Sequence, residues 1–308
     1  MNQWLMVQGE PRLSVFIELA VGDGDAQTSR TDAARIADAA QHAGITGLRL
    51  LDHCTESAID PSIAAAHLAG RYPALHYLID GPTTGNAPYN LARRILSVDR
   101  ATGGRIGLVL RPGSGDEVSQ AAAPEPGASD PAQRWSEYAA VLAALWESFP
   151  RSALAGDRQR AIVIDDTQIR AVDHSGRFYR VAGPLDGPAS VQGRPVLVAT
   201  DVDLLGSARI AAAADAVILD DHEFASTAEV VRKAMATVGR HRSDIAVLAR
   251  ISGGGDIQAP HGADGVVLAF PHGADQIITA ITSLATASAV RVGTTLRAGL
   301  GLRRQGAA

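Results

Sequence analysis

Cysteine and lysine are almost absent from this chain. It has 308 residues, with one cysteine, Cys54, and one lysine, Lys233. A single cysteine excludes an intramolecular disulfide framework and fits a cytoplasmic setting. The pattern around Lys233 predicts the middle of a helix. Schiff-base chemistry in a barrel needs a lysine at the end of a strand, so the sequence excludes that chemistry as well.

Long apolar runs and blocks of one charge are also missing. No apolar stretch reaches about 18 residues, so we expect no transmembrane helix. The first residues have neither the charged region nor the apolar segment of a signal peptide. The net charge of −5 and the lack of a dense Lys/Arg cluster argue against nucleic-acid binding. We therefore expect a cytoplasmic protein without membrane or nucleic-acid partners.

Short apolar runs alternate with helical patterns along the whole chain. The predicted strands are 14–19, 47–51, 75–79, 106–110, 195–199, 216–219, 245–249 and 265–269. The predicted helices are 32–43, 62–71, 89–101, 131–149, 204–213, 228–239 and 274–284. Eight strands with intervening helices indicate a (β/α)₈ TIM barrel, and a parallel sheet explains why these strands are almost wholly apolar. We expect one barrel domain that spans residues 1–308.

Capping residues mark where several of these helices begin and end. Thr31 precedes the first helix and Gly44 follows it. Ser226 or Thr227 is placed to cap the helix that carries Lys233. We expect those residues to set the helix boundaries.

Two stretches interrupt the alternation between the fourth and fifth strands. Residues 113–128 are rich in Gly, Pro, Ala and Ser, which is typical of a flexible loop. Residues 162–183 predict a β-hairpin excursion, in which 169–172 and 178–181 flank a turn at His174-Ser175-Gly176. If these segments belong to βα loops, they lie on the face where barrels place their active sites.

Carboxylates and imidazoles follow three of the predicted strands. The groups are Asp220-Asp221-His222-Glu223, Asp52-His53 and Pro271-His272. Together they have the chemistry of a divalent metal site. A solvated loop face is the commoner origin of such groups, and the first strand lacks the His-x-His of metal-dependent amidohydrolase barrels. We predict no metal site.

Four ordered blocks carry a resemblance to a known family. They are Pro88-Tyr89-Asn90-Leu91-Ala92-Arg93-Arg94, Arg134-Trp135-Ser136-Glu137-Tyr138, Asp173-His174-Ser175-Gly176-Arg177-Phe178 and Thr295-Leu296-Arg297-Ala298-Gly299-Leu300-Gly301-Leu302. With these blocks the chain resembles the flavin monooxygenases of the bacterial luciferase superfamily. The most similar branch contains nitrilotriacetate monooxygenase, dibenzothiophene-sulfone monooxygenase and pristinamycin synthase.

That resemblance implies a fold, a cofactor and partners. It implies a luciferase-like barrel, a homodimer, and reduced FMN that a separate flavin reductase supplies for oxygenation of a small organic substrate with O₂. A deazaflavin is the other cofactor used in the superfamily. The residues implied to contact the flavin or hold its phosphate are Asp52, Thr83, Thr84, Thr200, Gly253 and Gly254. No residue is identified as a general base.

Several positions depart from the family pattern. Val109 replaces an Asn after the fourth-strand motif, and Asp203 replaces the Ser that helps to cradle the flavin phosphate. Asp130-Pro131-Ala132-Gln133 stands where the family has a His-Tyr pair. A second interpretation therefore stays open, in which a degenerate barrel has lost tight flavin binding, needs no cofactor and acts as a structural or regulatory partner.

Overall fold

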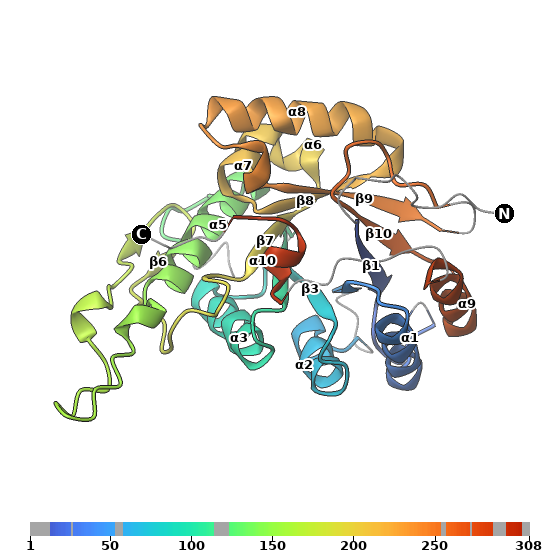
Figure 1. Cartoon of the computed structure of the whole chain (residues 1–308). Helices are drawn as coiled ribbons and strands as arrows, with labels where there is room; N and C mark the ends of the chain where they lie inside the picture. Colours follow the sequence, from blue (N-terminus) through green and yellow to red (C-terminus); the bar gives the residue numbers. More distant parts are fainter. Residues whose placement is uncertain are drawn as a thin grey trace.

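The computed structural model describes residues 13–25, 27–52, 58–113, 123–253, 257–271, 273–285 and 294–303. Its eight main strands are all parallel and close into a barrel in the order β1-β2-β3-β4-β7-β8-β9-β10 (Figure 1). Their bounds are β1 Ser14–Leu19, β2 Gly47–Leu50, β3 His76–Pro82, β4 Ile106–Arg111, β7 Val196–Ala199, β8 Ala216–Asp220, β9 Ala246–Ser252 and β10 Gly265–Ala269. The predicted TIM barrel is confirmed, and each predicted strand overlaps an observed one.

Helices surround this barrel on the outside. They are α1 Arg30–His42, α2 Pro61–Arg71, α3 Pro88–Ala101, α5 Pro131–Glu147, α6 Val202–Leu205, α7 Ser207–Ala213, α8 Phe224–Thr237, α9 Ala274–Ala285 and α10 Leu296–Gly299. Figure 1 shows α1, α2 and α3 along one side of the sheet, with α7 and α8 across the barrel from them. Within the described residues, no helix combines the length and the apolar character needed to cross a bilayer.

The interior of the barrel has an apolar middle layer. Alternate strand residues point inward, and these include Phe16, Leu78, Val109 and Leu248, all fully buried. Val109, which stands at the family's Asn position, is therefore part of the packed core. This layer separates the two ends of the barrel.

The short helix α10 closes the end of the barrel where the strands begin. Leu296 and Leu300 belong to the same apolar cluster as the interior strand residues. The Ser14 hydroxyl donates to the Gly299 carbonyl at 3.2 Å. Gly107 has no side chain to obstruct the fit, and a Cβ there would lie 2.8 Å from Leu296 Cδ2. The final sequence block thus supplies a plug for the barrel.

The predicted helix caps are partly wrong. Ser29 caps α1 instead of Thr31, because its hydroxyl accepts the Asp32 backbone N–H at 3.1 Å. The expected end at Gly44 is right, since this residue has φ +70° just after the helix.

Helices α7 and α8 also begin away from the predicted positions. Helix α8 starts at Phe224, and Ser226 lies inside it. The Phe224 side chain is buried, which favours a helix that begins a turn earlier than the polar residues suggest. Gly206, at φ +78°, separates α6 from α7, so the predicted helix 204–213 is two helices.

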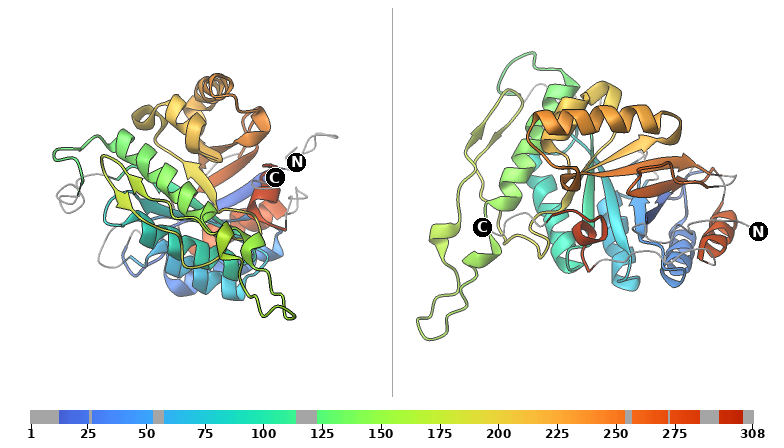
Figure 2. Two further views of the ribbon diagram at one scale, coloured as in Figure 1. Left: turned by 90° about the vertical axis from the view of Figure 1, so that its left-hand side faces the viewer. Right: turned by 45° about the horizontal axis from the view of Figure 1, so that its top comes forward.

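The chain makes a long excursion between α5 and β7. Figure 2 shows this segment running along the outside of α5. The predicted hairpin is present as the antiparallel pair β5 (His174–Ser175) and β6 (Arg180–Val181). The predicted strand 169–172 and the turn at His174 are wrong, because His174 itself pairs with Val181. The hairpin lies against Glu137 of α5, whose carboxylate accepts backbone N–H groups from the turn.

Candidate active site

A layer of charged side chains lies above the apolar interior, at the carboxyl ends of the strands. Each is the next inward residue after the apolar layer on its strand, since inward positions recur every second residue. We call this set the mouth ring: Glu18 of β1, Arg49 of β2, Asp80 of β3, Arg111 of β4, Asp220 of β8 and Arg250 of β9. Acidic and basic members alternate from β1 to β4. The end of a TIM barrel that carries active sites is therefore lined by paired charges.

Arg49 is the buried centre of the mouth ring. Its guanidinium binds Asp80 through two hydrogen bonds, of 3.0 and 3.1 Å, and Glu18 through a third, of 2.9 Å. The exposed fraction is 6% for the Arg49 side chain and 0% for Asp80. Burial raises the pKa of Asp80, and Arg49 opposes that rise. Burial also acts to raise the pKa of Glu18, but Arg250 and Arg49 outweigh it and lower that pKa below its ordinary value.

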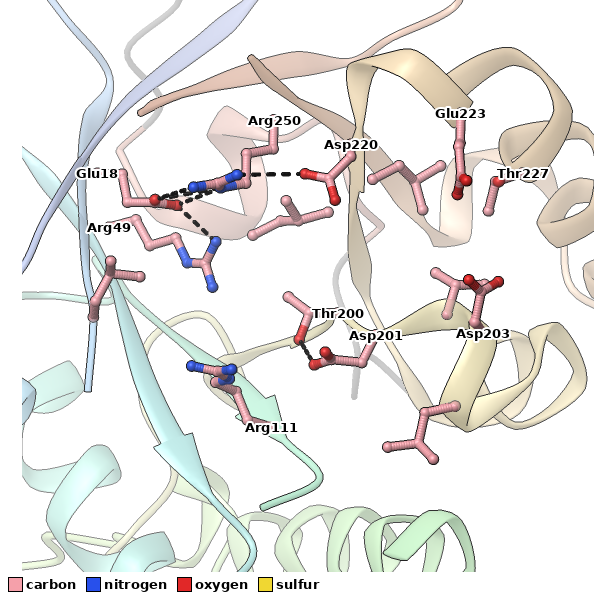
Figure 3. Close-up of a pocket in the computed structure, with 15 residues that line it drawn as sticks. Glu18, Arg49, Arg111, Thr200, Asp201, Asp203, Asp220, Glu223, Thr227 and Arg250 are labelled. Carbon is pink, nitrogen blue, oxygen red and sulfur yellow. Dashed lines mark hydrogen bonds and ion pairs between the residues drawn. The ribbon is translucent and has the colours of Figure 1, made fainter. Parts of the chain in front are cut away.

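Arg250 divides the mouth. Its guanidinium lies 2.7 Å from Glu18 and 3.5 Å from Asp220 (Figure 3). A cavity of about 520 Å³ lies on one side and another of about 570 Å³ on the other, and Glu18, Leu51 and Arg250 line both. The first cavity falls within the size range of small-molecule sites.

The far wall of the first cavity is acidic. It is formed by the segment from β7 into α6, which contributes Thr200, Asp201 and Asp203, and by Glu223 and Thr227 before and within α8. Figure 3 shows the Asp203 and Glu223 carboxylates directed toward one another. The Thr200 hydroxyl donates to Asp201 at 2.6 Å. Among the described residues, five carboxylates and three guanidinium groups line this cavity, so the formal charge of this described lining is −2.

The residues predicted to hold the flavin are not gathered in one cavity. Thr200 lines the first cavity and Gly253 the second. Thr83 is fully buried, and its hydroxyl donates to the Pro112 carbonyl and accepts a hydrogen bond from Arg134 at 3.2 Å. Thr84 is partly buried, beside Gly113.

The two remaining predicted residues lie elsewhere. Asp52 follows β2 and is not among the described residues that line either cavity. Gly254 lies outside the described residues. The flavin roles of all six residues stay predictions.

The sequence alone does not reveal the mouth ring as a unit. Its signal is a single charged residue at the last or next-to-last inward position of an otherwise apolar strand, as in Phe16-Ile17-Glu18-Leu19. One such residue is unremarkable at a strand end. Six of them, on six of the eight strands of one barrel, form a site only after the strands are placed in register.

The acidic and imidazole groups considered for a metal do not gather among the described residues. No cluster of three His, Cys, Asp or Glu side chains there has the geometry to hold an ion. His222 lies 3.9 Å from Asp221 and 3.7 Å from Glu223, and it is mostly exposed. His53, Cys54 and His272 lie outside the described residues.

Comparison with known proteins supports the same fold and identifies a family. A family model described as "Luciferase-like monooxygenase" matches residues 12–252. The chain belongs to this family. The resemblance seen in the sequence blocks is thereby confirmed.

Relatives of this luciferase-like chain include several named monooxygenases and a synthase. One polypeptide of pristinamycin IIA synthase from Streptomyces pristinaespiralis is 30% identical over 229 residues, 74% of this chain and 72% of the relative. Nitrilotriacetate monooxygenase component A from Aminobacter aminovorans is 27% identical over 198 residues, 62% of this chain but only 43% of the relative. EDTA monooxygenase from Chelativorans sp. BNC1 has the same fold, with a TM-score of 0.74 at 20% identity, over 96% of this chain and 99% of that one.

The residues of this luciferase-like mouth suit the apolar part of an FMN molecule but not its phosphate. By volume the first cavity accommodates a small organic ligand, and Leu51, Ile218 and Leu219 give it apolar surface. The segment after β7 that the resemblance assigns to the phosphate presents Asp201 and Asp203. Carboxylates repel a dianionic phosphate, so the donor set there does not fit that group.

Proposed function

We propose that this chain is a flavin-dependent monooxygenase-type oxidoreductase. It takes reduced flavin from a partner flavin reductase and oxygenates a small organic substrate with O₂. The observation that carries the proposal is the cavity of about 520 Å³ at the carboxyl ends of the strands, in a barrel of the luciferase-like monooxygenase family. A bound flavin supplies the redox chemistry in such a protein, and the chain supplies binding, orientation and exclusion of water.

The mouth ring has a positioning role in this proposal. Arg49 joins Glu18 of β1 to Asp80 of β3 and so holds the ends of three strands in a fixed arrangement. Because the mouth ring is held rigidly beside the cavity, less conformational entropy is lost when a ligand binds there. Arg111 is 44% exposed and lies 3.9 Å from Asp80, so it is the guanidinium of the first cavity best placed to meet an anionic group of the substrate.

The proposal extends to the assembly of the protein. We propose that residues 1–308 form one luciferase-like domain, that two copies form a homodimer, and that the protein is cytoplasmic. Reduced FMN is the flavin implied by the resemblance, and a deazaflavin is the alternative. Sedimentation of the purified chain measures the oligomeric state directly, and a monomer would remove the dimer from the proposal.

The charged residues of the mouth favour a second function, whereas the volume of its cavity favours the first. In this alternative the barrel is degenerate, binds no flavin tightly and serves as a structural or regulatory partner. The buried Glu18–Arg49–Asp80 network joins the ends of β1, β2 and β3 at the mouth, and Asp203 stands in the wall of the cavity. The retained cavity is the feature that this alternative does not explain.

Anaerobic titration with reduced FMN and reduced riboflavin tests the proposal. We expect micromolar binding of at least one flavin, and oxygen uptake that depends on this chain when a reductase supplies the reduced form. A bulky Thr227→Trp variant projects into the cavity and should weaken binding at least tenfold. Ser226→Trp is the matched control, because Ser226 is the exposed neighbour of Thr227 on α8. If neither flavin binds up to about 1 mM, which is an affinity of only about 4 kcal/mol, the flavoenzyme is excluded and the partner barrel is favoured.

A further inference from the structure

We infer that the mouth of this barrel selects a flavin without a phosphate, and therefore binds riboflavin in preference to FMN. The inference rests on the proposed function, since it concerns which flavin the same cavity takes. It is based on the distribution of charge over the two cavities of the mouth. Asp203 is the residue we assign as the main determinant.

The first observation is the chemistry of the segment after β7. Asp201 directly precedes α6, and Asp203 lies in its first turn; both line the first cavity. The free N–H groups at the start of a helix usually attract anions. Helix α6 has only 4 residues, however, and the carboxylate of Asp203 already lies in its first turn. Glu223 belongs to the same wall, and its carboxylate is directed toward that of Asp203 (Figure 3). A phosphate in this part of the cavity would meet carboxylates from two elements.

The second observation is that the arginines of the mouth are already paired. Arg49 is bound to Asp80 and Glu18, and Arg250 to Glu18 and Asp220. A guanidinium that is neutralised by carboxylates within hydrogen-bonding distance offers little net attraction to a further anion. Among the described residues of the first cavity, Arg111 is the remaining guanidinium, and the formal charge of that described lining is −2.

The second cavity gives no better place for a phosphate. Its described lining contains the carboxylates of Glu18, Asp25 and Asp32 and a single guanidinium, that of Arg250. The formal charge of this lining is again −2. Both sides of the Glu18–Arg250 pair thus oppose a dianion, whereas an uncharged ribityl chain meets hydroxyl and carboxylate acceptors that suit its O–H groups.

Riboflavin and FMN test this directly, because they differ only in the phosphate. The purified full chain is titrated with each flavin, oxidised and then anaerobically reduced, at 50 mM and at 500 mM salt. We expect Kd for riboflavin to be at least tenfold lower than Kd for FMN at low salt. The ratio should shrink at high salt, because ions screen the repulsion between partly exposed charges.

Substitutions at three positions assign the effect to residues. Asp203→Asn and Asp203→Ser should each lower the ratio of Kd for FMN to Kd for riboflavin at least fivefold. They should do so by improving FMN binding and leaving riboflavin binding nearly unchanged. Glu147→Gln removes the same charge at the opposite end of the barrel, where Glu147 is 60% exposed, and should leave the ratio unchanged. Arg111→Gln should weaken both flavins equally or not at all.

The outcomes separate the inference from the function on which it rests. Equal affinities, or tighter FMN binding, overturn the inference and leave the flavoenzyme standing. A selective loss of FMN affinity in Arg111→Gln would also overturn it, by placing the phosphate on Arg111. Binding of neither flavin, by a chain whose circular dichroism shows it folded, overturns the proposed function and the inference together.

Discussion

Glu18 and Arg250 meet across the barrel mouth with 2.7 Å between carboxylate and guanidinium, although 232 positions separate them in the sequence. The pair joins β1 to β9 over β10, which lies between them in the barrel. It also forms the common wall of the two cavities. Glu18 holds Arg49 on its other side, so one carboxylate connects the exposed part of the mouth ring to its buried part.

The two arginines bound to Glu18 should differ strongly in their effect on stability. Arg49→Met removes both hydrogen bonds that Arg49 donates to the buried Asp80 and leaves it, among the described residues, only Arg111, at 3.9 Å. Breaking a buried ion pair typically costs about 3 to 5 kcal/mol. Arg250→Met should cost less, about 1 to 2 kcal/mol, because Arg250 is 33% exposed and Glu18 keeps Arg49. Urea unfolding of both variants measures the difference. Equal decreases in the free energy of unfolding would mean that the buried Arg49 contributes no more to stability than the partly exposed Arg250.

Asp99, near the end of α3, should make stability depend on pH. Its Oδ1 accepts hydrogen bonds from the Ile106 N–H at 2.9 Å and from Gln192 at 2.8 Å. Burial raises its pKa from 3.8 to about 6. A raised folded-state pKa means that the folded chain binds this proton more tightly than the unfolded chain. The contribution to stability is thus complete below pH 3.8 and is lost as the pH rises through about 6.

Asp99→Asn tests that dependence, since an amide does not titrate. The free energy of unfolding of the wild type, relative to this variant, should fall by about 2 kcal/mol between pH 4 and pH 7. Asp166→Asn, at an exposed position, is the control and should give a flat difference. A flat difference for Asp99→Asn as well would show that the carboxyl titrates normally in the folded protein.

The barrel could be predicted from the sequence because its strands are recognisable one at a time. A run such as Ala216–Leu219 is apolar on both faces, as strands buried in a parallel sheet are. Boundaries failed where tertiary contacts override local signals. Phe224 is buried and extends α8 beyond the expected cap, and Gly206 interrupts a continuous helical pattern between α6 and α7.

The site could be predicted only in part, for a different reason. Thr200 and Gly253 each follow a predicted strand, and the structure places both in the lining of the mouth cavities; their flavin roles stay predictions. Thr83 matches the family wording, but its burial and its bond to Arg134 depend on packing that no local pattern contains. The partners of Arg49 likewise follow from strand register, which brings Glu18 and Asp80 to opposite sides of β2.

The hairpin beside α5 should depend on one carboxylate. Glu137 accepts backbone N–H groups from Arg177, Phe178 and Tyr179 at 2.8 to 3.1 Å, and His174 Nε2 lies 3.0 Å away. In Glu137→Gln the charge is lost and one acceptor oxygen becomes a donor, so we expect amide hydrogen exchange at 177–179 to accelerate at least tenfold. Glu147→Gln on the same helix is the control. Unchanged exchange would assign the hairpin's order to its apolar contacts.

The plug formed by α10 should be needed for the stability of the whole barrel. Leu296 is fully buried against strand residues of the interior, including Gly107. Leu296→Ala opens a cavity at the closed end of the barrel and should lower the free energy of unfolding by about 2 to 5 kcal/mol. Leu154→Ala removes the same atoms from a side chain that is 44% exposed, and should change it by no more than about 0.5 kcal/mol. If the two variants unfold at the same urea concentration, α10 contributes little to the stability of the barrel, and the final sequence block must be explained by something other than packing.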